Sequence, residues 1–334
     1  MAFSLFRLPC AAAALMLSFG ALAAHAAEKV SVRLKWIPQA QFAGFYVAKA
    51  KGFYSDAGLD MTINPGGPNI NVETLVASGA DTFGLASGTE GSLYAREKGL
   101  PLVTIAMSQQ MTPFAFVTYD DSGIKSVKDF KGKKVAVWFT GPQYTLYSLL
   151  AHEGVDRKDV QIVAQPFSMQ PFIDKQYDVA IVTLYNELNT LKEQGINNIR
   201  LFLPDDSGVT TQQDSLVTSD KMVKEKPQEV QAFLDATLKG WKYAFQHKQE
   251  AIDILMASGS GLDRKHQESM LDEIERVMTA KLGSTEGLGA IDMKAIAEVQ
   301  DSLLKYGALK KPVDLKAAFD SSFWEKVPDS DKKL

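Results

Sequence analysis

Residues 82–107 read TFGLASGTEGSLYAREKGLPLVTIAM, and this stretch contains one complete strand–helix–strand unit. The apolar runs at 82–86 and 103–107 have the length of buried strands. Residues 89–98 between them follow helical spacing, and Gly99 stands where helices commonly end. Two strands joined by one such helix run parallel in a single sheet, so the segment predicts an α/β fold.

The same alternation of strand and helix continues upstream of this unit. The period-two pattern at 30–36 and the apolar residues at 59–63 predict two strands, with a helix at 42–51 between them. Asn71 is expected to cap a further helix that ends at Gly79. Together these segments predict a parallel-rich sheet flanked by helices on both faces.

Downstream, a second cycle of strands and helices begins near Tyr119. Ser126 and Asp129 have the spacing of a capping box, and Pro142 suits the first position of a helix. Beyond Asp220 the pattern is helical only. Strands are expected at 135–138, 161–164, 179–183 and 199–203, and helices at 142–153, 171–175, 187–194, 249–257, 264–279 and 293–306, with a long helix opening at Pro227.

The two series of alternating strands and helices, before and after about Tyr119, predict two lobes. The helical end of the chain has too little sheet to stand alone, so it is expected to pack back on the first cycle. We therefore expect residues 27–117 and 213–334 to form one lobe and residues 118–212 to form the other. The chain would cross between the lobes twice, near 115–120 and 212–218, which makes these segments candidate hinges.

The first 26 residues have the layout of a secretory signal peptide. Arg7 precedes an apolar run at 11–24, and Ala24-His25-Ala26 is a typical cleavage pattern. The run is shorter than the roughly 18 to 20 residues of a membrane span. We expect cleavage after residue 26 and an exported, soluble, periplasmic chain, with an uncleaved anchor as the alternative. Cys10 is the only cysteine, so no disulfide or thiolate site is expected in the mature chain.

Charge and motifs argue against several function classes. The formal net charge is −4, and removal of residues 1–26, which hold one arginine and no acid, makes it −5. Such a mild value argues against nucleic acid or an anionic membrane surface as partner. The chain has no G-x-S-x-G, Walker A or G-x-G-x-x-G motif, and His152, His247 and His266 are expected to be solvated helix residues. We therefore predict no catalytic residue, no metal site and no cofactor.

Aromatic, amide and hydroxyl residues gather just after the predicted strands. In open α/β sheets, ligands bind outside the carboxyl ends of the strands. Helix caps and turns recruit the same residue types, so each group alone has both a structural and a binding interpretation. Convergence of groups from both lobes on one cleft favours binding. The predicted ligand-binding residues are Trp36, Gln39, Gln41, Phe42, Gly67, Ser87, Thr89 and Gln109 in the first lobe, and Phe139, Gln143, Tyr144, Tyr185, Asn186 and Glu187 near or in the second.

The segments 34–48 (LKWIPQAQFAGFYVA) and 51–60 (KGFYSDAGLD) resemble the opening of the NMT1/THI5-like solute-binding proteins. The blocks at 83–87 (FGLAS), 128–135 (KDFKGKKV) and 185–187 (YNE) also look like blocks of this family. The resemblance implies a two-lobed periplasmic-binding-protein fold of type II that closes on its ligand. It also implies a monomer that docks to an ABC permease with cytoplasmic ATPase subunits.

Members of this family serve importers for thiamine-pyrimidine precursors, and relatives bind riboflavin, sulfonates or nitrate. For the pyrimidine binders, the resemblance implies that Trp36 stacks on the ring and that Glu187 bonds its amino edge. The family's W-T-P-N-x-N stretch reads Trp36-Ile37-Pro38-Gln39-Ala40-Gln41 here. Glutamine keeps the amide but reaches further, which also admits a larger heterocycle such as a flavin. Structural alternatives remain: Trp36 as core filling, and Glu187 as an acid in a first helical turn.

The expected ligand is a thiamine-precursor pyrimidine of the hydroxymethylpyrimidine or formylaminopyrimidine type. Riboflavin or another nitrogen heterocycle, and a sulfonate or nitrate, are the alternatives, although a carboxylate at Glu187 would repel the two anions. A competing class within the family is a pyrimidine synthase that consumes its own active-site histidine and uses a cysteine-rich iron site. The signal pattern and the lack of mature cysteine oppose that class. A sensor that signals without transport is a third alternative.

Overall fold

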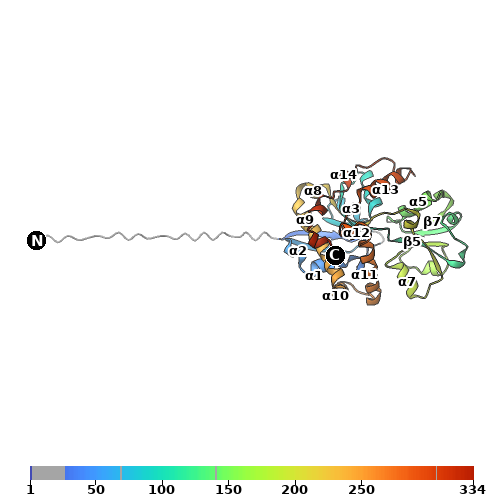
Figure 1. Ribbon diagram of the computed structural model, residues 1–334, viewed down its shortest axis with the longest axis horizontal. Coiled ribbons are helices and arrows are strands. Elements are labelled where there is room, and N and C mark those ends of the chain that lie inside the picture. The colour runs from blue at the N-terminus through green and yellow to red at the C-terminus, as the bar shows by residue number, and fades with distance from the viewer. Residues whose placement is uncertain (2–26, 68–69, 140, 306) are drawn as a thin grey trace.

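The computed structural model describes residues 1, 27–67, 70–139, 141–305 and 307–334. Two lobes lie side by side: a larger one with the N-terminal strands and C-terminal helices, and a smaller one from the middle of the chain (Figure 1). The predicted signal peptide falls outside the described residues, apart from Met1. Within the described ranges, no helix combines the length and apolar character of a membrane span.

The sheet of the larger lobe has the strand order β2-β1-β3-β10-β4. β1 pairs in parallel with β2 and β3, as the strand–helix–strand units predict. β10 runs antiparallel between β3 and β4, and sequence analysis did not predict this strand. Its only large apolar residues are Leu216 and Val217, and its polar side chains bond inside the sheet, as in the Thr218 hydroxyl to Thr82 O bond at 2.9 Å. The strands are β1 (Glu28–Arg33), β2 (Leu59–Asn64), β3 (Phe83–Ala86), β4 (Leu102–Gln109) and β10 (Gln213–Ser219).

Short helices connect these strands close to their predicted positions. Asn71 caps α3 as expected, because its side-chain oxygen accepts a hydrogen bond from Thr74 N at 2.8 Å. Gly99 follows α4 with φ +81°, a left-handed conformation that glycine adopts without strain. The helices are the 3-10 turn η1 (Ala40–Phe42), α1 (Ala43–Ala50), α2 (Phe53–Asp56), α3 (Val72–Ala77) and α4 (Thr89–Glu97).

The smaller lobe has the strand order β7-β6-β8-β5-β9. Alternate residues of β5 point to opposite faces of the sheet: Phe114 and Phe116 join one apolar core, and Ala115 and Val117 join another. The predicted capping box is present, since Ser126 N donates to Asp129 Oδ2 at 2.9 Å. The elements are β5 (Phe114–Tyr119), η2 (Asp120–Ser122), η3 (Val127–Phe130), β6 (Lys134–Val137), α5 (Gln143–His152), η4 (Arg157–Asp159), β7 (Gln161–Ala164), α6 (Gln170–Ile173), β8 (Val179–Thr183), α7 (Glu187–Glu193), β9 (Ile199–Phe202) and η5 (Pro204–Ser207).

The C-terminal helices pack on the larger lobe, as predicted. The apolar stripe of α9, including Phe233 and Trp241, joins the same core as strand residues Val30 and Val32. α9 lies close against α1, because a Cβ on Gly240 would stand 2.3 Å from Gly44 O. The helices are α8 (Asp220–Glu225), α9 (Pro227–Gln246), α10 (Lys248–Ser258), α11 (Arg264–Met278), α12 (Leu282–Thr285), α13 (Met293–Lys305), α14 (Leu315–Ala318), α15 (Ser322–Lys326) and α16 (Asp329–Lys332); the predicted end of α13 at Tyr306 lies outside the described residues.

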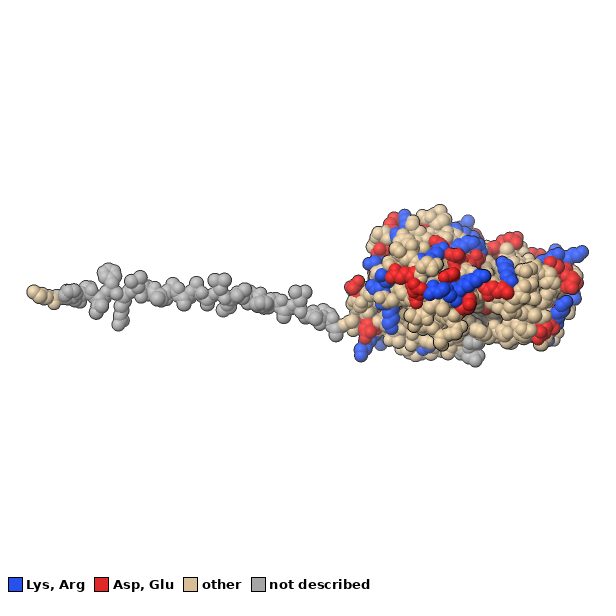
Figure 2. Space-filling model, turned by 90° about the horizontal axis from the view of Figure 1, so that it is seen from below, with Lys and Arg blue, Asp and Glu red and all other residues tan. Residues whose placement is uncertain are grey.

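The chain passes between the two sheets after β4 and again before β10. The two passages touch, since Thr211 N donates to the Thr112 hydroxyl at 2.9 Å. The predicted boundary between residues 117 and 118 falls inside β5, whose pairing with β8 begins at Phe114. The predicted boundary at 213 coincides with the start of β10. Figure 2 shows basic and acidic side chains interspersed over both lobes on the face drawn there.

Candidate functional site

A cavity of about 990 Å³, counted out to its open mouth, lies between the lobes. Residues just beyond the carboxyl ends of β1, β3, β6 and β8 form much of its wall, as expected for open α/β sheets. The lining residues are Lys35, Trp36, Gln39, Gln41, Ile70, Asn71, Val72, Glu73 and Ser87 from the larger lobe, and Phe114, Trp138, Phe139, Pro142, Thr183, Tyr185, Asn186 and Glu187 from the smaller one.

The structure brings eight of the fourteen predicted site residues together around this cavity. They come from both lobes, which is the convergence that the sequence argument required. The eight are Trp36, Gln39, Gln41, Ser87, Phe139, Tyr185, Asn186 and Glu187.

Four predicted site residues of the larger lobe lie away from the lining, and Gln109 is one of them. Phe42 is fully buried in the apolar core, because η1 turns its ring toward the sheet and the helices. Gly67 is buried in the loop after β2. Thr89 is the first residue of α4, and its hydroxyl and its backbone N both donate to Gln212 O at 3.0 Å. That bond ties α4 to the second passage between the lobes.

Two predicted residues of the smaller lobe have structural partners instead. The Gln143 side-chain oxygen accepts a hydrogen bond from Gly141 N at 2.7 Å and so holds the turn before α5. The Tyr144 ring stacks on Tyr94 of the larger lobe, with centroids 3.9 Å apart. Tyr144 therefore contributes to contact between the lobes.

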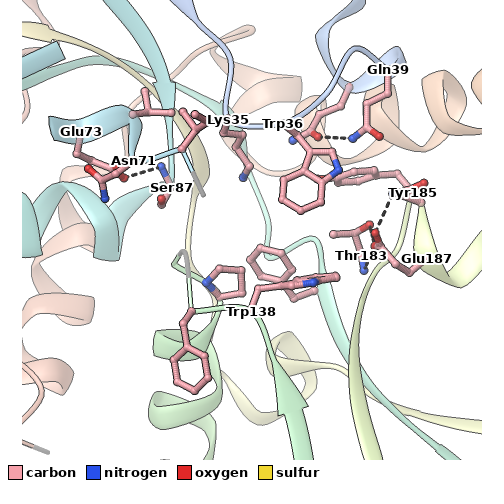
Figure 3. A pocket seen from close by; sticks show the side chains of 17 residues that line it. Lys35, Trp36, Gln39, Asn71, Glu73, Ser87, Trp138, Thr183, Tyr185 and Glu187 are labelled. Atoms are coloured by element: carbon pink, nitrogen blue, oxygen red, sulfur yellow. Dashed lines mark hydrogen bonds between the residues drawn. The ribbon is translucent and has the colours of Figure 1, made fainter. Parts of the chain in front are cut away.

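Two tryptophans bound the cavity from opposite sides. Figure 3 shows the Trp36 indole on the side of the larger lobe and the Trp138 indole facing it from the smaller lobe. Trp36 also stacks on Phe167 of the smaller lobe, with centroids 5.6 Å apart and planes 7° from parallel. Flat apolar walls of this kind favour a planar, aromatic occupant.

Asp214 organises the wall that belongs to the larger lobe. Lys35 Nζ donates to Asp214 Oδ1 at 2.5 Å. Gln41 Nε2 and Gln109 Nε2 donate to Asp214 Oδ2 at 2.7 and 2.9 Å, and Gln39 Nε2 donates to Gln41 Oε1 at 2.7 Å. One buried carboxylate therefore holds three side chains directly and Gln39 through Gln41, although Gln109 itself lies behind the lining rather than on it.

The backbone of Asp214 is unusual. Its φ is +55°, in the left-handed region that non-glycine residues seldom adopt and that aspartate and asparagine tolerate best. The residue is the second of β10, directly after the chain returns from the smaller lobe. From this strained backbone position, the Asp214 carboxylate reaches the side chains of the cavity wall.

Tyr185 connects this network to the smaller lobe. Burial raises the pKa of Tyr185 well above its usual value, the charges of Asp214 and Glu187 raise it further, and bonds with Gln109 and Gln41 oppose the shift. The phenol therefore stays neutral at physiological pH and keeps its proton for hydrogen bonding.

Glu187 is both a helix-start residue and a cavity residue. It is the first residue of α7, where the helix dipole favours an acid. Its Oε2 accepts from Thr183 N at 3.0 Å and from the Thr183 hydroxyl at 2.5 Å, and its Oε1 accepts from Asn186 Nδ2 at 2.8 Å. Burial raises the pKa of Glu187, and the bonds from Thr183 oppose that shift.

A contact between α11 and α7 also joins the lobes. His266 of α11 reaches α7, with its Nε2 2.8 Å from Asn186 Oδ1 and its Nδ1 3.1 Å from the Glu193 carboxylate. His266 therefore lies in the interface between the lobes, not in solvent as the sequence suggested. Burial raises the pKa of Glu90 on α4 to about 7, and the hydrogen bond that its Oε2 accepts from Gln213 Nε2 at 2.9 Å opposes the shift.

Sequence reasoning missed several lining residues. Trp138 follows β6 directly, so the strand-end criterion that selected Phe139 could have found it. Glu73 lies inside α3, where no strand-end signal points to it. The residues missed are Lys35, Ile70, Asn71, Val72, Glu73, Phe114, Trp138, Pro142 and Thr183. In the described part of the chain, no group of three or more His, Cys, Asp or Glu residues could hold a metal ion.

Several solved structures share the fold of this chain. The periplasmic aliphatic sulphonate binding protein SsuA from Escherichia coli superposes with a TM-score of 0.67 at 14% identity, covering 87% of this chain and 91% of SsuA. A conserved Candida albicans protein with the generic periplasmic binding protein fold gives 0.66 at 16% identity, covering 88% and 96%. Two mixed sheets flanked by helices thus form the periplasmic-binding-protein fold that the sequence predicts.

Sequence relatives carry narrower descriptions. The riboflavin-binding protein RibY of Chloroflexus aurantiacus is 27% identical over 89% of this chain and 86% of its own length. The formylaminopyrimidine-binding protein of Halalkalibacterium halodurans is 28% identical over 89% and 91%. A 4-amino-5-hydroxymethyl-2-methylpyrimidine phosphate synthase of Candida albicans is 27% identical over 67% and 69%. The profile of the family described as NMT1/THI5 like matches residues 39–251, more than half of the sequence, and the chain therefore belongs to this family.

Proposed function

We propose that this protein is the exported solute-binding component of an ABC importer, and that it closes around a thiamine-precursor pyrimidine. The observation that carries the proposal is the pairing of the Trp36 indole from one lobe with the Glu187 carboxylate from the other across a single cavity. The fold supports a cycle in which binding closes the lobes about the two passages, and a permease recognises the closed form. The expected partners are that permease and its ATPase subunits, with a monomeric binding protein.

The chemistry of the wall supports a neutral, hydrogen-bonding ring. Stacking on tryptophan contributes on the order of 1 kcal/mol beyond the burial of apolar area. Glu187 offers acceptor oxygens to ring N–H and amino groups, which an aminopyrimidine supplies. Asn186, Tyr185 and the Gln39–Gln41 pair can then select the pattern of donors and acceptors around the ring.

The charges of the wall disfavour an anion, although sulphonate-binding proteins share the fold. Lys35 is the lining cation, and it is already paired with Asp214. Glu73 and Glu187 add two carboxyl groups to the same cavity. Bringing a sulfonate or nitrate beside them would place like charges together in a partly desolvated space.

Binding rather than catalysis is the proposed activity, although pyrimidine synthases belong among the relatives. The cavity lining contains neither histidine nor cysteine among the described residues. The neighbouring histidine, His266, is engaged by Asn186 and Glu193 in the contact between the lobes. The side chains around the cavity are therefore suited to holding a ring in place.

A flavin is the second candidate for the ligand. The cavity extends past the two tryptophans to a polar end around Asn71 and Glu73, which gives room for more than a pyrimidine ring (Figure 3). RibY, described as riboflavin-binding, aligns with nearly all of the described chain.

Mass spectrometry of the small molecule that co-purifies with the protein, followed by calorimetry with aminopyrimidines and riboflavin, tests the proposal. We expect a heterocycle to be found and to bind. We also expect taurine and nitrate to leave the melting temperature unchanged. A clear rise in melting temperature with either anion would overturn the ligand class.

A further inference from the structure

Glu73 lies at the end of the cavity away from Glu187 (Figure 3). Its side chain is buried, with 8% exposed, and its Oε1 accepts a hydrogen bond from Ser87 N at 3.1 Å. Within the described residues, its Oε2 makes no hydrogen bond and no Lys or Arg pairs with the carboxylate. Glu73 lines the cavity, so this free acceptor is available to a donor group of a bound molecule.

The space beside Glu73 is kept open by a glycine on the neighbouring helix. A Cβ at Gly91 of α4 would stand 2.9 Å from Glu73 Oε1 and 2.7 Å from the Ser87 Cβ. Any side chain at that position would displace the carboxylate or the Ser87 backbone that it holds. The glycine thus preserves both the position of Glu73 and its hydrogen bond to Ser87.

Lys35 supplies the matching donor. Its ammonium group has three N–H donors, and the bond to Asp214 uses one of them. Asp214 also fixes the direction of the Lys35 side chain, which Figure 3 shows between Trp36 and the Glu73 end of the cavity. This end therefore offers a carboxylate acceptor and an ammonium donor to the same occupant.

We infer that Glu73 and Lys35 form a second subsite, which binds a hydroxyl-bearing substituent of the ligand while the ring lies between the tryptophans. Hydroxyl groups both donate and accept hydrogen bonds, so such a substituent can donate to Glu73 and accept from Lys35. A phosphate ester in the same place would be repelled by the carboxylate. The inference rests on the proposed function and narrows it to rings that carry an alcohol side chain.

Two pairs of ligands that differ in hydroxyl groups test the inference by calorimetry. Riboflavin is compared with lumiflavin, and 4-amino-5-hydroxymethyl-2-methylpyrimidine is compared with 4-amino-2,5-dimethylpyrimidine. In the pair whose ring binds, we expect the hydroxylated member to bind about tenfold tighter or more, as for a hydrogen bond to a charged group. In Glu73→Gln, we expect that preference to fall to about threefold or less, with the affinity of the other member unchanged.

Glu97→Gln is the matched control. Glu97 is also a buried glutamate that accepts from a backbone N–H, that of Lys310, but it lies outside the cavity lining. This variant should keep the full preference for the hydroxylated ligand. Glu73→Gln retains an acceptor for Ser87 N, and its thermal unfolding reports whether the fold is intact.

The possible outcomes separate the inference from the proposed function. Rings that bind with no preference for the hydroxyl group, or a preference that survives in Glu73→Gln, would overturn the subsite and leave the proposed function standing. If no heterocycle binds the wild-type protein, the proposed function is wrong and the subsite falls with it.

Discussion

The two walls of the cavity are built in different ways. In the smaller lobe, Glu187 takes its hydrogen bonds from Thr183 and Asn186, which lie within four residues of it in the chain. In the larger lobe, Lys35 and Gln41 depend on Asp214, more than 170 residues further along. One wall is therefore a local loop, and the other is assembled from distant segments.

This difference indicates which substitutions should disturb each wall. The local wall needs only β8 and α7, because Thr183 at the end of β8 and Asn186 just before α7 donate the hydrogen bonds to Glu187. The distant wall exists only after β10 has inserted between β3 and β4 and has delivered Asp214 in a left-handed conformation. Changes to the Asp214 hydrogen bonds of the larger lobe should therefore affect folding and binding together, whereas changes at Glu187 should affect binding alone.

The largest effect is expected for Asp214→Asn. Asparagine tolerates the left-handed backbone, but it removes the charge that pairs with Lys35. We expect a loss of about 2 kcal/mol in unfolding free energy and of about a hundredfold in ligand affinity, because the amide keeps only one acceptor oxygen and turns a donor toward side chains that also donate. Urea denaturation and calorimetry measure the two losses. Wild-type affinity in this variant would show that ligand binding does not depend on the hydrogen bonds to the Asp214 carboxylate.

Trp36→Ala should come next. The indole is partly exposed and packs on the outside of the larger lobe's core, so its removal leaves the fully buried core residues in place. We expect heterocycle affinity to fall about tenfold or more while the melting temperature stays nearly constant. Phe167→Ala, which removes only the partner of the stack, is the control and should have a smaller effect. A stable Trp36 variant that binds normally would reject the stacking role.

Glu187→Gln is expected to weaken binding by about fivefold, since a neutral amide replaces a charged acceptor of the same shape. Stability should change little, because Gln still accepts from Thr183 N and the helix start is preserved. Calorimetry at neutral pH measures the effect. A loss as large as that of Asp214→Asn would contradict the distinction between the two walls.

The smallest effect is a pH dependence that comes from Glu90. Its pKa of about 7 lies above its usual value because the carboxyl group is buried, with Thr145 of the smaller lobe nearby, and we expect opening of the lobes to expose it. The folded, closed form therefore binds more protons than the unfolded form between about pH 4.5 and 7, so stability is fullest at the acid end and declines as pH rises. We expect ligand affinity to be about threefold higher at pH 5.5 than at pH 8, and this difference to vanish in Glu90→Gln. Binding that tightens as pH rises would contradict this sign.

The sequence predicted most of the fold because its strand and helix signals are local. The strands at 59–63, 161–164 and 179–183 and the capping box at Ser126 match the structure within a residue. The strand β10 was not predicted because its sequence, QDSLVTS, is polar. Polar side chains are buried in a strand only when neighbouring segments supply hydrogen-bond partners, as Thr82 O does for Thr218. The cavity residues that follow strands were found for the same local reason, and Trp36, Tyr185 and Glu187 are among them.

The alternation of apolar residues and the turn signals suffice to specify the α/β class, the two cycles and the residues at the strand ends, since each depends on neighbours within a few positions. The anchoring of Lys35 and Gln41 by Asp214, and the meeting of Glu73 with Ser87, belong to the folded molecule alone. These contacts join segments that no periodic pattern in the sequence marks as partners. Only the packing of β10 and α3 in the larger lobe places Asp214 behind the cavity wall and Glu73 in its lining.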